Sequence, residues 1–253
     1  MYTLPYVKIT VVKKTFKQTK ERCNLDIIFH GQSCVEIRFE EHTIIIDPFL
    51  THNPQAVVKA EDIKADYVLV THGHGDHLGD TLPIAERNGA TIIAPNDLGR
   101  YLSFKGAATH GMGIGGAYQF PFGRVKLTLA LHDSSFNEPG TKENIYTGMA
   151  SGFLITAEGK TIYHAGDTGL FGDMKLIGEL NDIDLAFLPI GDNYTMGPDD
   201  AVIAAKMLKA KCIVPMHYNT FPVIAQDPEA FVSRLAAEKI EGYVMAPGHM
   251  ITL

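Results

Sequence analysis

The amino-acid sequence predicts an α/β fold in which two β-sheets pack together and helices cover their outer faces. A length of 253 residues with 45% apolar content is enough to bury one large core, which favours one large domain over two small ones. Short β-rich runs come first, and both halves of the chain then pass into alternating strands and helices. Because every sheet or helix must bury its apolar face, this order favours two sheets with helices outside.

Three β-rich runs open the folded part, and Gly-containing or polar turns separate them. They are DIIFH (26–30), CVEIRF (34–39) and TIIID (43–47). This pattern is typical of an antiparallel meander. The apolar run YVLVTH (67–72), a helix over 77–88 and the strand TIIAP (91–95) then form a β-loop-α-β unit.

The second half is predicted to begin with sheet and to end in β/α alternation. The expected strands are RVKLTLAL (124–131), GFLITA (152–157), TIYHA (161–165), DLAFLPI (184–190), CIVPMH (212–217) and YVMA (243–246). The expected helices cover residues 172–180, 198–210 and 228–239. Pro198 and Pro228 stand where the first turn of a helix tolerates proline.

Residues 1–25 are predicted to form an N-terminal basic extension, and residues 26–253 the folded domain. The extension carries Lys8, Lys13, Lys14, Lys17, Lys20 and Arg22 against Glu21 alone. We expect it to be partly disordered or to add an edge strand through YVKITVV; a tether to membrane or nucleic acid is the alternative. The pattern of a secretory signal is missing, and no segment has the length and apolarity of a membrane span.

Charge and cysteine content narrow the expected partners and compartment. The 22 basic and 29 acidic residues give a formal charge of -7, which makes nucleic acid a poor partner. Cys23, Cys34 and Cys212 are too few and too scattered for a disulfide framework. We therefore expect a cytoplasmic protein that acts on a small molecule and does not enter a membrane.

The segment THGHGDH (71–77) is the strongest functional signal in the chain. His72, His74, Asp76 and His77 bring four metal donors into six residues, and imidazole and carboxylate are donors that divalent ions such as zinc prefer. The apolar strand before the loop fixes where it begins, and glycines at 73 and 75 let the backbone turn sharply. The spacing predicts a metal site.

Four donors from one loop cannot enclose two ions, so a dinuclear site needs donors from elsewhere. His132, Asp167 and His217 each follow a predicted strand. If parallel strand ends converge on one edge of the sheets, these three side chains meet the histidine loop.

With this histidine loop and these strand-end donors, the chain resembles the metallo-β-lactamase superfamily. Within that superfamily it resembles the small bacterial metal-dependent hydrolases related to L-ascorbate 6-phosphate lactonases. The matching segments are HGQSCVEI (30–37), IIIDPFL (44–50), THGHGDHLGD (71–80), HAGDTGLF (164–171), DLAFLPIGDNYTMGP (184–198) and PMHYNTFP (215–222). The resemblance runs from about residue 26 to the C-terminus and implies a four-layer αββα sandwich.

The resemblance also implies a role for each donor. It places His72, His74 and His132 in a first metal site, and Asp76, His77 and His217 in a second. Asp167 is expected to bridge the two ions. Asp47, which ends a strand, resembles an aspartate that supports the histidine loop without binding metal.

The expected reaction is hydrolysis by a hydroxide that bridges two divalent ions. Asp76 and Asp167 are the expected catalytic residues, since they would orient the hydroxide and could take its proton. Zinc is the expected ion, and manganese and iron suit the same donors. The expected substrate is a small ester, lactone or related acyl compound.

Residues near the expected site have structural alternatives as well. Asn193 and Tyr194 could contact the substrate, or their loop could simply cap the helix that starts at Pro198. His30 could line the site or make a structural hydrogen bond. A supporting role is expected for His164, and His249 is not expected to be a ligand.

Three other functions compete with ester or lactone hydrolysis. A phosphodiesterase or nuclease of the same superfamily is opposed by the acidic balance and the lack of room for an added domain. A di-iron redox protein is opposed by His74, where that branch has glutamate. A non-catalytic metal scaffold is opposed by the complete donor set. The lactonase relatives form oligomers, so a homo-oligomer stays open, although no motif marks an interface.

Overall fold

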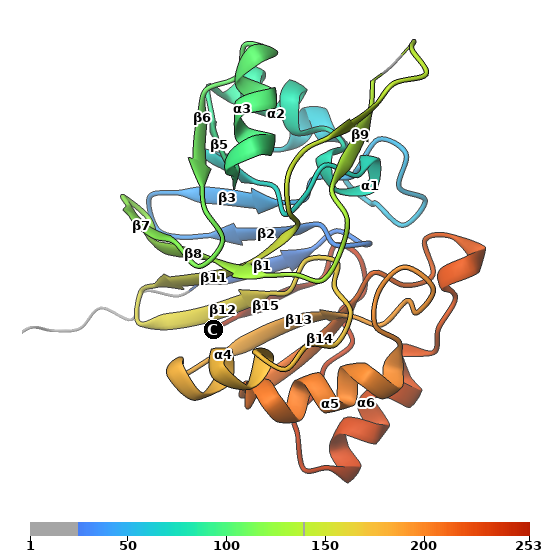
Figure 1. Ribbon diagram of the computed structural model, residues 1–253. Coiled ribbons are helices and arrows are strands. Elements are labelled where there is room, and N and C mark those ends of the chain that lie inside the picture. Colours follow the sequence, from blue (N-terminus) through green and yellow to red (C-terminus); the bar gives the residue numbers. More distant parts are fainter. Residues whose placement is uncertain (1–24, 139) are drawn as a thin grey trace, which may run out of the picture.

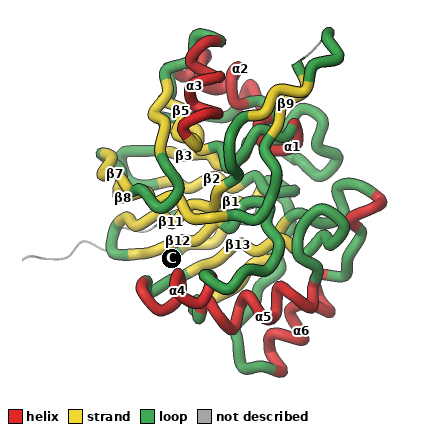
Figure 2. Tube along the Cα trace, in the orientation of Figure 1, coloured by secondary structure: helices red, strands yellow, loops and turns green. Residues whose placement is uncertain are grey.

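Two β-sheets stacked face to face form the centre of the molecule, and helices cover both outer faces (Figure 1). The computed structural model describes residues 25–138 and 140–253. Two helices lie on one outer side, α2 (Thr81–Asn88) and α3 (Asn96–Phe104). Three lie on the other, α4 (Met174–Leu180), α5 (Pro198–Leu208) and α6 (Pro228–Ala237), as the red segments of Figure 2 show. This is the expected four-layer αββα sandwich.

The first sheet has seven strands in the order β15-β1-β2-β3-β4-β5-β6. Its strands are β1 (Asp26–Phe29), β2 (Val35–Arg38), β3 (Thr43–Ile46), β4 (Tyr67–Leu69), β5 (Thr91–Pro95), β6 (Thr109–Met112) and β15 (Met250–Thr252). Strands β1, β2 and β3 pair antiparallel, which confirms the meander, and β3 to β6 pair in parallel. Strands β1, β3 and β4 therefore run in the same direction.

The second sheet has six strands in the order β14-β13-β12-β11-β8-β7. Its strands are β7 (Ala117–Phe120), β8 (Gly123–Leu129), β11 (Ser151–Ala157), β12 (Lys160–His164), β13 (Leu185–Pro189) and β14 (Cys212–Met216). Strand β11 is antiparallel to both β8 and β12, whereas β12, β13 and β14 are parallel. Strands β8, β12 and β14 therefore also share one direction.

Short helices and one hairpin complete the described part of the chain. The helices are α1 (Gly75–Leu78), α2 (Thr81–Asn88), α3 (Asn96–Phe104), α4 (Met174–Leu180), α5 (Pro198–Leu208) and α6 (Pro228–Ala237), with 3-10 turns η1 (Ala60–Asp62) and η2 (Pro222–Ile224). The hairpin of β9 (Ser135–Asn137) and β10 (Asn144–Tyr146) projects away from both sheets (Figure 1). No helix of these described segments is long and apolar enough to cross a membrane.

The alternation of side chains along the strands divides the core into two parts. In β3, Ile44 and Ile46 belong to the core that contains the apolar residues of both sheets, whereas Ile45 belongs to the core beneath α2 and α3. Both faces of such a strand are buried, which is why TIII is a continuous apolar run rather than an alternating one.

Some expected elements differ from the observed ones. The continuous helix over 77–88 is wrong, because Gly79 at φ 36° ends α1 before α2 begins. A Cβ at Gly79 would lie 2.5 Å from the Pro48 carbonyl oxygen, so this break also depends on close packing. The strand YVMA (243–246) is not formed. Of the expected extension, residues 1–24, with YVKITVV, lie outside the described part.

Candidate metal centre

Six polar side chains follow strands that run in the same direction in the two sheets. His30, Asp47 and the loop at His72 come after β1, β3 and β4. His132, Asp167 and His217 come after β8, β12 and β14. Two backbone hydrogen bonds join the sheets at this edge, from Ser151 N to Thr71 O (3.0 Å) and from His217 N to Gln32 O (2.7 Å). The strand ends therefore converge as expected.

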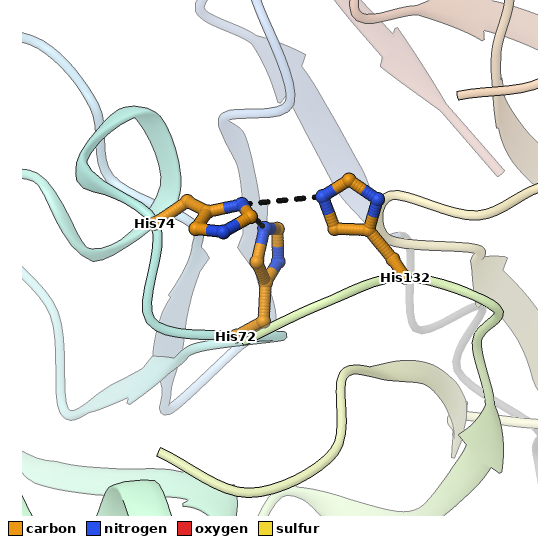
Figure 3. Close-up of side chains that lie close together, drawn as sticks. All are labelled: His72, His74 and His132. Atoms are coloured by element: carbon orange, nitrogen blue, oxygen red, sulfur yellow. Dashed lines mark hydrogen bonds between the residues drawn. The ribbon is translucent and has the colours of Figure 1, made fainter. Parts of the chain in front are cut away.

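The first group of donors consists of His72, His74 and His132 (Figure 3). His74 Nδ1 lies 3.0 Å from His72 Nε2 and 3.2 Å from His132 Nε2. Ligand atoms of a tetrahedral zinc site lie roughly 3.3 Å apart when each bond is about 2.0–2.1 Å. The three histidines, whose ligand atoms all lie within 4.8 Å of one another, can therefore bind one ion.

The second group consists of Asp76, His77, Asp167 and His217, whose donor atoms all lie within 4.8 Å of one another. Asp167 Oδ2 is 3.2 Å from His77 Nε2 and 3.0 Å from His217 Nε2. Asp76 Oδ2 is 3.4 Å from His217 Nε2 and 3.7 Å from His77 Nε2. These oxygen and nitrogen donors suit a second divalent ion.

One oxygen atom lies close to both groups. Asp167 Oδ2, which is near His77 and His217, is also 3.7 Å from His132 Nε2 of the first group. The two groups are therefore parts of one centre, with Asp167 between them.

Asp47 orients histidines of both groups from beneath the loop. Its Oδ2 accepts a hydrogen bond from Thr71 Oγ1 (2.7 Å) and is hydrogen-bonded to His77 Nδ1 (2.8 Å). Thr71 Oγ1 is in turn 3.0 Å from His72 Nδ1. Because both Nδ1 atoms are held in this way, Nε2 of His72 and of His77 keeps its lone pair for the centre. This geometry is the supporting role expected for Asp47.

Three buried atoms of the second group, His77 Nε2, His217 Nδ1 and Asp167 Oδ1, have no hydrogen-bond partner among the described residues. Two of them, His77 Nε2 and Asp167 Oδ1, can bind a cation. Leaving a buried polar atom unpaired is costly, and coordination of a metal ion would satisfy both atoms. The donor set thus fits divalent ions by chemistry and by geometry.

Burial and charge divide the centre into a neutral part and a charged part. Burial, reinforced by the charge of His77, holds the pKa of His72 well below its ordinary value. Burial also lowers the pKa of His74 and of His132, so the first group consists of neutral imidazoles able to bind metal.

In the second group the charges outweigh burial. Burial alone would raise the pKa of Asp167, but the charges of His217 and His77 hold it well below the usual range. Burial alone would lower the pKa of His217, but the Asp167 carboxylate raises it to about 9. The same balance lowers the pKa of Asp76 and raises that of His77. A divalent cation would satisfy these carboxylates in place of the imidazolium protons.

Gln32 is a contact of the centre that sequence reasoning missed. Its Nε2 donates to Asp76 Oδ2 (2.8 Å), and its carbonyl oxygen accepts from His217 N (2.7 Å). The residue is fully buried, with a φ of 54°. Its place two residues after His30, at the end of a strand, is the signal that could have identified it.

A cavity of about 610 Å³ opens onto the centre. Five of the expected ligands line it: His74, Asp76, His132, Asp167 and His217. The other lining side chains are Phe49, Tyr194, Phe221 and Val223. Tyr194, which was predicted to contact the substrate, thus lines the cavity, whereas nothing in the sequence pointed to the apolar residues.

Asn193 and His30, also expected near the substrate, are not among the cavity-lining residues. Asn193 is exposed in the same loop as Tyr194. His30 is buried and its Nε2 lies 2.9 Å from Glu36 Oε2, which is the structural alternative considered for it. A buried carboxylate needs such a partner, and that need accounts for the histidine.

Two further histidines, His164 and His249, do not line the cavity. His164 Nδ1 accepts from Gly166 N (3.2 Å) and its Nε2 is 2.9 Å from the Ser33 carbonyl oxygen, so it holds the turn before Asp167. His249 is exposed and lies 3.1 Å from Tyr243 Oη.

The two loop glycines differ in what they contribute. Neither has a positive φ, so the sharp turn expected from glycine is not what requires them. A Cβ at Gly73 would collide with Thr147 Oγ1, and Gly73 N donates to Ser134 Oγ (3.1 Å). A Cβ at Gly75 would have nothing within 4 Å. Close approach to the base of the β9–β10 hairpin therefore explains Gly73 alone.

Known proteins resemble this chain over most of its length. A family model described as the beta-lactamase superfamily domain matches residues 42–218. A metal-dependent hydrolase of Bacillus cereus (strain B4264) is 57% identical over 229 residues, covering 90% of this chain and all (100%) of that protein. A metal-dependent hydrolase of Bacillus thuringiensis subsp. konkukian (strain 97-27) is 56% identical over 229 residues, which again cover 90% of this chain and 100% of that protein.

Solved structures agree with this likeness. A metallo hydrolase from the hyperthermophilic archaeon Ignicoccus hospitalis superposes with a TM-score of 0.83 at 37% sequence identity. The superposition covers 91% of this chain and 98% of that one.

Proposed function

Since this chain belongs to the metal-dependent hydrolases of the metallo-β-lactamase superfamily, we propose a reaction for it. The protein uses two divalent ions to hydrolyse a small ester, lactone or related acyl compound. The seven proposed ligands are His72, His74, Asp76, His77, His132, Asp167 and His217.

The position of Asp167 carries the dinuclear part of the proposal. Its Oδ2 lies within 3.0–3.7 Å of ring nitrogens from both donor groups. A mononuclear site would need only the first three histidines, and the buried second group would then have no function. An oxygen shared between two groups of donors is what a bridging ligand requires.

When bound, two divalent ions would lower the pKa of a water between them and polarise the substrate's acyl oxygen. The protein's part is to place that water and to move its proton. Asp167, with a side chain only 3% exposed, is held by His217 and His77 and suits the positioning role. Asp76 lines the cavity with a side chain that is 24% exposed. This position, between the centre and solvent, suits Asp76 to accept a proton from that water and pass it to solvent.

For the metal ion and the cellular setting we keep the predictions made from the sequence. The mixed nitrogen and oxygen donors favour zinc as the resident ion, and manganese or iron satisfy the same set. A cytoplasmic setting, a homo-oligomeric state and kinship to L-ascorbate 6-phosphate lactonases stay predictions. Cys34 and Cys212 are free, as a reducing setting requires.

Elemental analysis tests the proposal directly. The wild type, purified without chelator, should contain about two equivalents of a transition metal. Asp167→Ala and His132→Ala should each contain less, whereas the exposed control His249→Ala should match the wild type. Circular dichroism would confirm that each variant is folded. A metal content that neither substitution changes would show that the ligand assignment is wrong.

The same preparations would then be assayed with lactones, phosphate-bearing esters and phosphodiesters. Metal-dependent turnover of the first class supports the proposed substrate. Turnover confined to phosphodiesters would contradict it.

A further inference from the structure

We propose that the cavity selects an uncharged substrate with an alkyl or aryl group and disfavours substrates that carry a phosphate. This rests on the proposed function and specifies its substrate class. Besides the proposed metal ligands, four side chains line the cavity: Phe49, Tyr194, Phe221 and Val223.

An apolar wall, formed by Phe49, Phe221 and Val223, lines the cavity together with the centre. The rings of Phe49 and Phe221 lie with their centroids 6.4 Å apart and their planes 34° from parallel. Aromatic surfaces in this arrangement can contact a flat or flexible apolar group through dispersion and burial. Val223, 52% exposed, extends the wall toward the mouth.

Backbone hydrogen bonds hold the wall in place. Asn219 N donates to Ile224 O (3.0 Å), which closes the loop carrying Phe221 and Val223. The fully buried Ile224 anchors that loop in the protein interior. On the other side, Phe49 N donates to Asp47 O (2.7 Å), so Phe49 is fixed to the same residue that orients the histidines. A preformed apolar surface of this kind favours binding because little ordering is needed.

The wall offers no partner to a second anionic group. Among the described residues that line the cavity, none is lysine or arginine. A phosphate remote from the reacting bond would lose its hydration against Phe49, Phe221 and Val223 without gaining a cation. The formal charge of -7 adds long-range repulsion of anions. Tyr194, 57% exposed, supplies a hydroxyl that a neutral polar group can use.

The test measures binding without turnover, so that it does not depend on the hydrolysis itself. The probes are 2-methyl-, 2-propyl- and 2-pentyltetrahydrofuran, which are cyclic ethers that cannot be hydrolysed. A fourth probe carries a phosphate at the far end of the pentyl chain. Equilibrium dialysis with the metal-loaded protein gives each dissociation constant, and inorganic phosphate is measured alone to account for its direct binding to metal.

The affinity of the wild type should rise about fourfold for each added methylene, as expected for burial of about 0.8 kcal/mol per group. The terminal phosphate should weaken binding about tenfold or more relative to the unmodified pentyl ether. Binding of the phosphate-bearing ether as tightly as the unmodified one, beyond what inorganic phosphate explains, would overturn the inference.

Two variants probe the wall itself. Phe221→Ala should reduce the gain per methylene. Val223→Lys, at a position exposed enough to accept a charge, should tighten binding of the phosphate-bearing ether about fivefold. Leu180→Ala, an exposed leucine on α4 that does not line this cavity, is the matched control and should change nothing.

The outcomes separate this inference from the proposed function. Length-dependent binding without hydrolysis of any lactone or ester would leave the apolar selectivity standing and overturn the proposed reaction. Hydrolysis of a lactone or ester, together with ether binding that does not depend on chain length in the wild type or in Phe221→Ala, would support the proposed reaction and overturn the apolar selectivity.

Discussion

The side-chain amide of Gln32 donates a 2.8 Å hydrogen bond to Asp76 Oδ2, the carboxylate oxygen that faces His77 and His217. The carbonyl oxygen of Gln32 accepts from the backbone of His217 at 2.7 Å, so one residue contacts two members of the second donor group. Both Gln32 and His217 have positive φ angles, of 54° and 55°. Strained backbone conformations of this kind persist where the surrounding structure imposes them.

Replacing Gln32 should weaken metal binding at the second group. Gln32→Ala removes the hydrogen bond that orients Asp76, and we expect a loss of about tenfold or more in affinity for the second ion, with little change for the first. Competition with a chromophoric chelator would resolve the two binding steps. Gln119→Ala, on the edge strand β7, is the control. Equal weakening of both steps would argue for a general structural effect instead.

Replacing Asp47 should affect both ions. Its Oδ2 is linked to His77 directly and to His72 through Thr71, so Asp47→Asn should disturb one histidine of each group. We expect a loss of about 10–100-fold in affinity for both ions. Asp26→Asn, whose carboxylate bonds Thr252 on an exposed edge, serves as the comparison and should bind like the wild type. Undiminished affinity in Asp47→Asn would refute the orienting role.

The two loop glycines should respond differently to alanine. Gly73→Ala forces a methyl group against Thr147 Oγ1, and we expect a destabilisation of about 1–3 kcal/mol. At Gly75 a methyl group meets nothing within 4 Å, so Gly75→Ala should change the free energy of unfolding by less than about 0.5 kcal/mol. Urea unfolding followed by circular dichroism measures both. Similar losses of stability in the two variants would mean that glycine is required by the loop conformation, and not by the contact with the hairpin.

The contribution of Glu36 to stability should depend on pH. Burial alone would raise its pKa, but hydrogen bonds from His30 and Arg38 outweigh burial and hold the pKa below its ordinary value of 4.5. The unfolded chain therefore takes up this proton first as the pH falls. The contribution is complete above pH 4.5 and is lost as the pH falls through the lower pKa of the folded protein.

Glu36→Gln provides the measurement. At pH 7 we expect the variant to be about 1–3 kcal/mol less stable than the wild type, because it loses hydrogen bonds to a charged acceptor. The difference should shrink below pH 4.5. Glu40→Gln, on an exposed turn, should show no such trend. A stability difference that stays constant with pH would mean that the charge of the Glu36 carboxylate does not stabilise the fold.

Residues that repeat a local pattern could be placed from the sequence, and residues defined by distant neighbours could not. The proposed ligands follow apolar strands, and strand direction alone brings the strand ends together, so the clustering of these side chains could be predicted. The pairing of β1 with β15 joins residues such as Asp26 and Thr252 from opposite ends of the chain, and three residues give no periodicity to detect. Helix α3 was not predicted, because Gly99 interrupts it and glycine disfavours a helix. The structure gives the reason for this glycine: an added Cβ would lie 3.3 Å from the Cα of Gly111.

The cavity wall illustrates the same limit. Phe49 and Phe221 lie far apart in the chain and belong to loops. In a loop, the sequence does not indicate whether an aromatic residue packs in the core or lines a cavity. Only the packed structure shows that both line the cavity. Gln32 was overlooked for a related reason, since a glutamine next to a strand is common and only its two contacts show its role.

The order of the donors along the chain bears on when the protein can acquire metal during its synthesis. The first group is complete in sequence once His132 has been made, whereas the second still lacks Asp167 and His217. A chain leaving the ribosome would thus have the donors for one ion well before it has those for the other. The Asp167 carboxylate that lies between the groups is also made after His132.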